Sequence, residues 1–274
     1  MARERVLVTV KTYPTLSRKY GETVCTAGVR EDASWMRIYP VPFRRLDQKE
    51  QYRKFDWLNC DFIKSKTDPR PETRHPADFS QLDPVGHLDT KNNWRERRLL
   101  LLQTAEVHTR LQPLIEGAKS TGLSLAVFKP TKIKGFVWEE EEDRDWDPKK
   151  VVEMRNRTQQ GELFAEETWR QTFELIQKLP YNFSYRFEDD AGQSSEMQIL
   201  DWEIGALYWN CLRSCNGDEK AALQKVKAKY LDEFCKRDLH FFLGTTQQFH
   251  FVAPNPWVII GVFPIPHERQ LGLI

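Results

Sequence analysis

The chain has 274 residues, 40% of them hydrophobic and 30% charged, which is the composition of a globular protein and excludes a disordered one. Its 41 basic and 40 acidic residues give a net charge of +1, so any nucleic-acid site must rest on local patches of charge. Five scattered cysteines without a Cys-x-x-Cys pair exclude a disulfide framework and indicate a reducing compartment.

The sequence also gives an expectation about location. The charged N-terminus lacks the apolar stretch and cleavage site of a signal peptide. No run approaches the roughly 18 apolar residues that a membrane span needs. We therefore expect a cytoplasmic protein with no membrane contact.

The first part of the chain is predicted to be rich in strands. Val6 to Val10 is an apolar run that ends before Pro14, and two later runs are joined by a short hairpin-like connection. The predicted elements are strands at 6–10, 22–30, 35–39 and 57–63 and a short helix at 46–55. This pattern indicates a small open sheet or barrel.

A proline-rich stretch follows, from Thr67 to Asn93, and is predicted to be a long loop of the kind that is often functional or mobile. Beyond it we expect helices at 94–103 and 109–120, the second closed by Gly122, and strands at 124–128 and 133–139. The acidic stretch from Glu139 to Asp147 marks the predicted boundary between two units, 1–140 and 148–274.

The second unit mixes helices and strands. We expect helices at 166–179, 203–215 and 218–237 and strands at 181–187, 239–243 and 257–263. Tyr181, Phe183, Tyr185 and Phe187 alternate and should share one face. The last strand is apolar on both faces, so we expect it to be central and buried.

A short N-terminal pattern resembles a known family. Ser17-Arg18-Lys19 precedes a strand with Cys25-Thr-Ala-Gly28, and Trp35-Met-Arg37 follows. This order resembles the opening of the dual-OB-containing family of bacterial conflict and defence neighbourhoods. The resemblance implies an OB-like barrel and nucleic-acid binding, and it supplies no catalytic residue. We therefore expect an α+β fold, with an OB-like N-terminal unit that carries a helical insertion, followed by helices and a small C-terminal sheet.

Basic and aromatic residues are interleaved in the same segment. Nucleic-acid grooves use cations to follow phosphates and aromatic faces to stack on bases. The predicted contacts are Arg18, Lys19, Trp35, Arg37, Tyr39, Arg44 and Arg45, with Trp35 and Arg37 foremost. The alternative is that the aromatic residues belong to the core and the arginines to a solvated face.

Two further basic sets occur downstream. The first places Arg95, Arg97 and Arg98 beside Trp94, and the second consists of Lys129, Lys132 and Lys134. Each set alone is more typical of a solvated face than of a binding site.

Candidate catalytic groups are few. Asp201 and Glu203 could hold Mg²⁺ or act as an acid–base pair, but Asp201 is also well placed to cap the helix that follows. The spacing from Asp61 to Lys64 is one residue too long for a nuclease core. Cys211 and Cys215 share a helix face, where packing is favoured over zinc. Gly244-Thr245-Thr246 is interpreted as a simple turn. We predict no catalytic residue, metal or cofactor.

His75 and His87 lie in the proline-rich stretch and become site residues only if that stretch closes over a ligand. From these patterns we predict a non-catalytic nucleic-acid-binding component of a prokaryotic defence or genome-maintenance complex, which binds DNA or RNA and docks a larger protein partner. Two alternatives stay open. One is a protein–protein adaptor subunit, and the other is a metal-dependent nuclease that uses Asp201 and Glu203.

Overall fold

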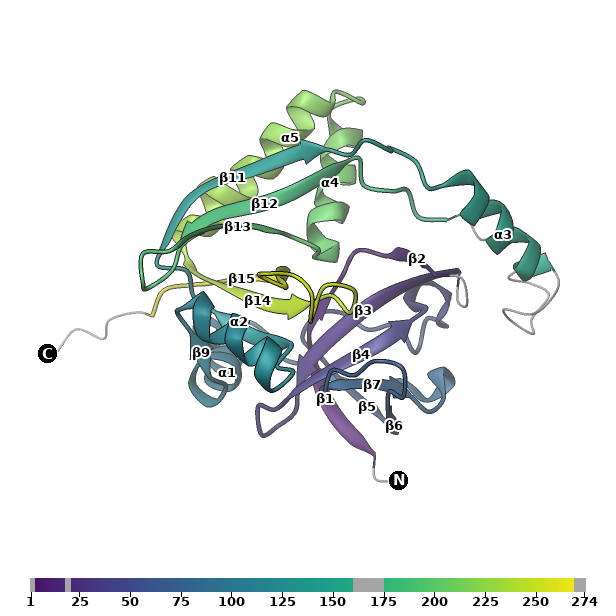
Figure 1. The fold of residues 1–274 in the computed structure, drawn as a ribbon, viewed down its shortest axis with the longest axis horizontal. Helices are drawn as coiled ribbons and strands as arrows, with labels where there is room; N and C mark the ends of the chain where they lie inside the picture. The colour runs from purple at the N-terminus through teal and green to yellow at the C-terminus, as the bar shows by residue number, and fades with distance from the viewer. Residues whose placement is uncertain (1–2, 18–20, 160–174, 269–274) are drawn as a thin grey trace, which may run out of the picture.

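The computed structural model describes residues 3–17, 21–159 and 175–268 (Figure 1). A strand-rich, strongly curved sheet in the N-terminal half precedes helices and smaller sheets in the C-terminal half. The predicted α+β class, with a strand-rich N-terminal unit followed by helices and a small C-terminal sheet, is confirmed. Within the described ranges no helix is both long enough and apolar enough to span a membrane.

The strands are β1 (Glu4–Lys11), β2 (Thr15–Ser17), β3 (Gly21–Val29), β4 (Trp35–Val41), β5 (Asp56–Cys60), β6 (Phe62–Lys64), β7 (Thr73–Pro76), β8 (Asp83–His87), β9 (Val107–His108), β10 (Leu125–Phe128), β11 (Lys132–Glu140), β12 (Tyr181–Glu188), β13 (Ser194–Gln198), β14 (Asp238–Thr245) and β15 (Trp257–Ile265). The α-helices are α1 (Lys91–Arg98), α2 (Leu111–Ser120), α3 (Pro148–Gln159), α4 (Trp202–Ser214) and α5 (Glu219–Lys227). Short 3₁₀ and π segments are η1 (Phe43–Arg45), η2 (Phe79–Gln81), η3 (Leu99–Thr104), η5 (Ala228–Glu233) and η6 (Phe234–Lys236).

The largest sheet lies in the N-terminal half, and its strands follow the order β6-β7-β4-β3-β1-β5-β8. β1 is antiparallel to β3 and β5, β3 is antiparallel to β4, and β4 is parallel to β7. Only Asp61 separates β5 from β6, and β6 pairs with β7. The path therefore returns to its start, and the sheet curves round its own core.

β1 is buried on both faces, which explains its continuous apolar run. Val6 and Val8 belong to the core enclosed by the curved sheet, whereas Leu7 and Val10 belong to a second core outside it. The register shifts between Val8 and Val10, so the strand carries a bulge that changes which side chains face outward.

The second core joins the two halves of the chain. The sheet β15-β14-β10-β9 packs on the outer face of β1 and β3. Phe242 and Phe263 stack with their centroids 5.4 Å apart, and Trp35 of β4 meets Phe242 edge-on at 6.0 Å. Because this core draws on both halves, neither half buries its apolar surface alone.

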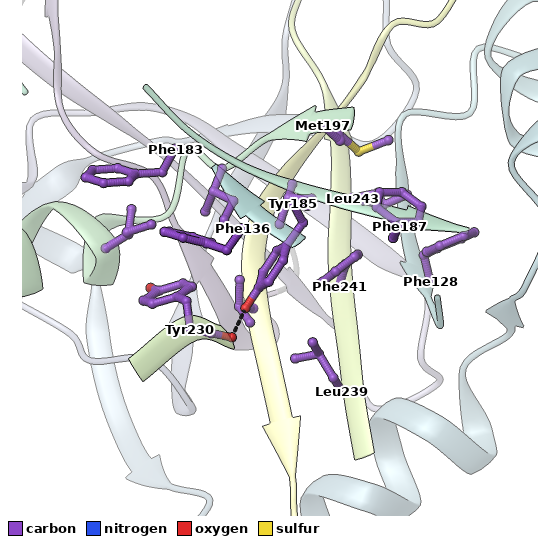
Figure 2. Close-up of a cluster of buried hydrophobic side chains, with 14 of the residues drawn as sticks. Phe128, Phe136, Phe183, Tyr185, Phe187, Met197, Tyr230, Leu239, Phe241 and Leu243 are labelled. Atoms are coloured by element: carbon purple, nitrogen blue, oxygen red, sulfur yellow. Dashed lines mark hydrogen bonds between the residues drawn. The ribbon is translucent and has the colours of Figure 1, made fainter. Parts of the chain in front are cut away.

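A third sheet, β11-β12-β13, faces β14 across an aromatic core (Figure 2). Tyr185 stacks on Phe241 at 5.1 Å, and its hydroxyl donates to the carbonyl oxygen of Tyr230 at 2.6 Å. Phe183, Tyr185 and Phe187 are all buried, so the predicted one-sided alternation along β12 is confirmed. α4 and α5 close the same core.

Three sequence predictions are wrong in detail. Residues 46–55 form no α-helix; Leu46 and Tyr52 fill the enclosed core while Phe55 joins the outer core, so packing on two sides overrides the local pattern. The predicted loop at 67–93 contains β7 and β8. β8 tolerates Pro84 because it is an edge strand, where a missing N–H leaves no partner unpaired.

The third concerns β15, which is buried on both faces but lies at the end of its sheet instead of the centre. Its outer edge is covered by the segment before α4, since Leu200 N donates to Ile259 O at 2.8 Å. The predicted helix at 166–179 falls mainly on residues outside the described ranges. The division at 140–148 stays a prediction, although β10 pairs with β14 and β11 with β12 across it.

The contact between β1 and β3 gives a test of this packing. A Cβ at Gly28 would lie 2.1 Å from the carbonyl oxygen of Leu7, so the backbones can approach only because residue 28 has no side chain. Gly28→Ala should lower the free energy of unfolding by about 2–3 kcal/mol in urea denaturation. Gly135→Ala in β11, where a Cβ meets nothing within 4 Å, is the matched control and should leave it unchanged or slightly raised. Equal stability of both variants would contradict this packing.

Candidate ligand-binding site

A cavity of about 540 Å³ lies where the curved sheet meets the C-terminal half. Its walls include Thr12–Thr15, Cys25, Arg37, Tyr39 and Arg70 from the N-terminal half, and Trp146, Tyr181–Phe183, Gln198–Asp201 and Thr245–Gln248 from the C-terminal half. This volume falls within the range of small-molecule sites, and more of the surface that lines the cavity is apolar than polar.

Arg37 of β4 forms part of one wall and is only 1% exposed. Its guanidinium donates to the hydroxyl of Ser124 at 2.6 Å and to the carbonyl oxygen of the same residue at 2.8 Å. Ser124 in turn donates from its hydroxyl and its backbone N–H to the carboxylate of Glu72, at 2.8 and 3.0 Å. Burial lowers the pKa of Arg37 from its usual value, and Glu72 and Asp68 partly oppose this shift.

Arg70, 3% exposed, occupies the neighbouring position. Its Nε donates to both carboxylate oxygens of Asp68, at 2.8 and 3.1 Å, and its Nη1 donates to the carbonyl oxygen of Thr245 at the end of β14. Burial raises the pKa of Asp68, but hydrogen bonds and charge from Arg70 outweigh it and hold the pKa below its usual value. Thr73 also donates to Asp68, at 3.0 Å.

These bonds form one buried polar network, made of Asp68, Arg70, Glu72, Thr73, Arg37, Ser124, Thr245 and His250. It ties the connection between β6 and β7 to the start of β10 and the end of β14. Two guanidinium groups face two carboxylates, so the charges within the network balance.

The opposite wall is also hydrogen-bonded. Gln198 Nε2 donates to Asn182 Oδ1 at 2.5 Å, and the Asn182 amide donates to Glu141. Lys178 pairs with Glu141 at 2.9 Å, which lowers the pKa of that carboxyl. Every cation that lines the cavity in the described ranges is therefore already engaged.

Three polar groups in the lining have no such partner among the described residues. The hydroxyl of Thr246 is buried and makes no hydrogen bond. The Tyr39 hydroxyl and the Gln248 side-chain amide likewise lack one within the described ranges. A buried donor without a partner costs free energy, so the Thr246 hydroxyl marks where a ligand could be held, whereas the exposed Gln248 and the half-buried Tyr39 can also bond to solvent.

The five predicted contacts that the structure describes do not form one surface. Trp35 packs on Phe242, and Arg37 is buried in the network; a role for either as an exposed nucleic-acid contact does not agree with this placement. Tyr39 reaches the cavity. Arg44 pairs with Glu22 at 2.9 Å. Arg45 is partly buried, and burial lowers its pKa. Arg18 and Lys19 lie outside the described residues.

The basic set on α1 also differs from expectation. Arg97 and Arg98 are 5% and 9% exposed, so they do not form a solvated face. The Arg97 guanidinium lies 3.7 Å from the Phe55 ring centroid, and Nε donates to Leu88 O at 2.8 Å; burial lowers its pKa to about 10. Arg98 pairs with Asp238 at 3.5 Å. In the basic set formed by Lys129, Lys132 and Lys134, Lys129 pairs with Asp238 and Lys134 pairs with Glu188, while Lys132 is exposed.

Asp201 acts as a helix cap. One of its oxygens accepts from Glu203 N at 3.2 Å, and the other accepts from Val262 N and from Lys54 Nζ, both at 3.1 Å. Glu203 also pairs with Lys54 at 3.1 Å. Both carboxylates are thus occupied by the protein, which favours the capping interpretation over a Mg²⁺ site.

The other candidate ligands are equally structural. Among the described residues no group of three His, Cys, Asp or Glu is placed to hold a metal ion. Cys211 is buried in the aromatic core. His87 Nδ1 lies 2.7 Å from Asp56, and Nε2 lies 3.2 Å from Arg97. His75 bonds the adjacent Pro76 carbonyl. Gly244 and Thr245 end a strand, and Thr246 reaches the cavity.

One perturbed group escaped sequence analysis. Lys11 Nζ lies 3.6 Å from the Phe43 ring centroid and 4.6 Å from that of Trp202. Burial lowers the pKa of Lys11 to about 8, although Glu203 and Asp201 oppose the shift. The local sequence around Lys11 does not predict this environment, because the aromatic rings come from distant segments.

Two family models match the chain. Residues 2–103 match a domain of unknown function (DUF8758), and residues 107–273, more than half of the chain, match another (DUF8757). The chain belongs to the DUF8757 family. A search of curated proteins finds no match. The boundary between the two matched segments lies between η3 and β9. Residues of both segments line the cavity.

The buried histidines of this DUF8757 member should make its stability depend on pH. Burial lowers the pKa of His250, with Arg70 and Arg37 adding to the shift and Glu72 and Asp68 opposing it; burial also lowers the pKa of His240. The unfolded chain therefore binds protons more readily than the folded protein below about pH 6.5. Stability should be full above that pH and fall as the pH drops towards 5. Urea midpoints measured across this range test the expectation.

The matched variants are His250→Gln and His267→Gln, the second at an exposed position. His250→Gln should flatten the loss of stability between pH 7 and pH 5, whereas His267→Gln should not. If the stability of His250→Gln falls between pH 7 and pH 5 as steeply as that of the unaltered protein, this histidine does not titrate as described.

Proposed function

We propose that this protein is a cytoplasmic, non-catalytic nucleic-acid-binding component of a prokaryotic defence or genome-maintenance complex. The defence setting rests on the N-terminal resemblance alone. The binding function is supported by one observation above all: a hydrogen bond from Gln247 to Thr67 joins a loop that carries exposed lysines to a loop that carries exposed phenylalanines.

This basic–aromatic surface consists of Lys64 and Lys66 from the N-terminal half and Phe249, Phe251 and Val252 from the C-terminal half. Both lysines are exposed and have no acidic partner among the described residues. Phe249 and Phe251 are 49% and 53% exposed. Gln247 Nε2 donates to Thr67 O at 2.9 Å, which holds the two loops together.

Such a combination suits a single strand better than a duplex. Lysines follow the phosphate backbone, and each exposed ring offers a face on which a base stacks. Large exposed apolar side chains cost solvation free energy, so a pair of phenylalanines beside lysines favours a binding role over a solvated loop.

The pairing of the strands supports the same proposal. β1, β3, β4, β5–β6 and β7 form five pairing segments of a curved sheet, as an OB-like barrel requires. OB folds bind oligonucleotides through the face of the second and third strands and through the loops after the first and fourth. Among the described residues these positions correspond to β3–β4, to the segment that follows β1 and to residues 65–72. Lys66 belongs to the last of these.

A protein–protein adaptor is the second candidate, because the same exposed phenylalanines could dock an apolar partner. The dependence of affinity on salt concentration distinguishes the two functions. Affinity for nucleic acid falls steeply as salt rises, whereas affinity for an apolar partner does not. The nuclease alternative has no comparable support, since Lys54 and backbone N–H groups occupy Asp201.

The direct test is fluorescence anisotropy with single- and double-stranded DNA and RNA across a salt series. We expect binding that favours single strands and weakens as salt rises. Lys64→Gln/Lys66→Gln should weaken it on the order of tenfold and reduce the salt slope by about two. The charge-matched control is Lys149→Gln/Lys150→Gln on α3, which extends away from the rest of the fold (Figure 1). No binding to any of the four ligands would refute the proposal for this chain.

A second pair of variants tests whether bases stack on the exposed phenylalanine rings. Phe249→Ser/Phe251→Ser should weaken binding of single strands by roughly 1–3 kcal/mol for each stacked base and change duplex binding little. Val252→Ser, at a neighbouring position that is 75% exposed, controls for loss of apolar surface without a ring. Equal losses in both variants would mean that the rings do not stack on bases.

A further inference from the structure

We propose that the cavity between the two halves binds an uncharged nitrogen heterocycle of the nucleobase class. The ligand could be a free nucleoside or nucleotide, or one base of a longer strand. This inference concerns a site separate from the basic–aromatic surface and does not depend on binding of a polymer.

The first support is the shape of the lining. Tyr39 contributes a ring from the β4 side, and Tyr181 and Trp146 contribute rings from the C-terminal half. Rings from both halves of the chain provide surfaces on which a planar ligand can stack. A cavity of about 540 Å³ is large enough for a single nucleoside and too small for a folded strand.

The second support is the set of polar groups without partners. The buried Thr246 hydroxyl makes no hydrogen bond in the described structure, and Gln248, an exposed residue of the same lining, has an amide without a protein partner there. A side-chain amide offers a donor and an acceptor side by side, which matches the edge of a base. Asn182 and Gln198 add two further amides to the lining, already oriented by their mutual hydrogen bond.

The third support is charge. Arg37 and Arg70 are held in the buried network, and Lys178 is paired with Glu141. None of these cations in the described lining is available for a phosphate. The cavity therefore suits a neutral ring, and a phosphate attached to the ligand would remain outside. A nucleoside and its 5′-monophosphate should accordingly bind with similar affinity.

The experiment is calorimetric titration of the full chain with four nucleosides, with their monophosphates and with single-stranded oligonucleotides. We expect at least one nucleoside to bind. The Kd of its monophosphate should lie within about threefold of the Kd of the nucleoside, which is less than the roughly 1.4 kcal/mol that a tenfold change represents. Thr246→Val keeps the shape of the side chain and removes the hydroxyl. It should weaken nucleoside binding at least about fivefold while leaving the urea midpoint unchanged or raised, because an unpartnered buried donor is lost.

Two controls locate the ligand. Gln248→Ala should weaken nucleoside binding, whereas Gln193→Ala, at an exposed turn, should not. Cys25 lines the cavity, so a saturating nucleoside should slow its alkylation by iodoacetamide, and the partly exposed Cys235 outside the lining should react at an unchanged rate. Peptide mass spectrometry reads both rates in one sample.

The outcomes separate this inference from the proposed function. Nucleoside binding with protection of Cys25 supports the inference, even if no oligonucleotide binds. Oligonucleotide binding without any nucleoside binding or protection of Cys25 overturns it and leaves the proposed function standing. Binding of monophosphates but not of nucleosides also overturns it, because the site would then recognise phosphate.

Discussion

The buried hydrogen bonds of Arg37 and Arg70 are the constraint on which the rest of the structure depends. Two guanidinium groups without water must be matched by carboxylates and carbonyl oxygens, or the cost of burial is not offset. Asp68, Glu72, Ser124 and Thr245 supply these partners. Since the partners come from the β6–β7 connection, from β10 and from β14, the network fixes how the curved sheet sits against the C-terminal half.

This arrangement brings together two loops, one from each of the two matched segments. The connection that carries Asp68 and Arg70 also carries Lys66 and Thr67, and β14, whose end Arg70 contacts, leads into Thr246, Gln248 and the exposed phenylalanines. The cavity and the basic–aromatic surface are therefore positioned by the same buried bonds. The outer face of β3 and β4 is in part covered by the second sheet, and what remains of it lines the cavity.

Local pattern predicted most of the elements of this fold but not its site. The alternation along β12, the apolar runs of β1 and β15 and the Asp201 cap were readable because burial and capping leave periodic or positional signals. Trp35 and Arg37 are the foremost nucleic-acid contacts that the sequence predicts, yet their packing against Phe242 and Ser124, which are far away in the sequence, removes them from the surface. Arg70 lies in a stretch predicted as a loop, and Thr246 looked like part of a turn. A cavity whose lining comes from segments more than a hundred residues apart gives no local signal.

The most direct test of this account is a hydrogen-exchange footprint of the protein with and without a single-stranded oligonucleotide, read by mass spectrometry on peptides across the chain. A single binding face predicts slower exchange in both halves at once, in peptides that cover residues 62–76 and residues 245–252, with α3 and α5 unchanged. Protection confined to one half, or centred on α3 or α5, would contradict the claim that the two domains build a single nucleic-acid-binding face.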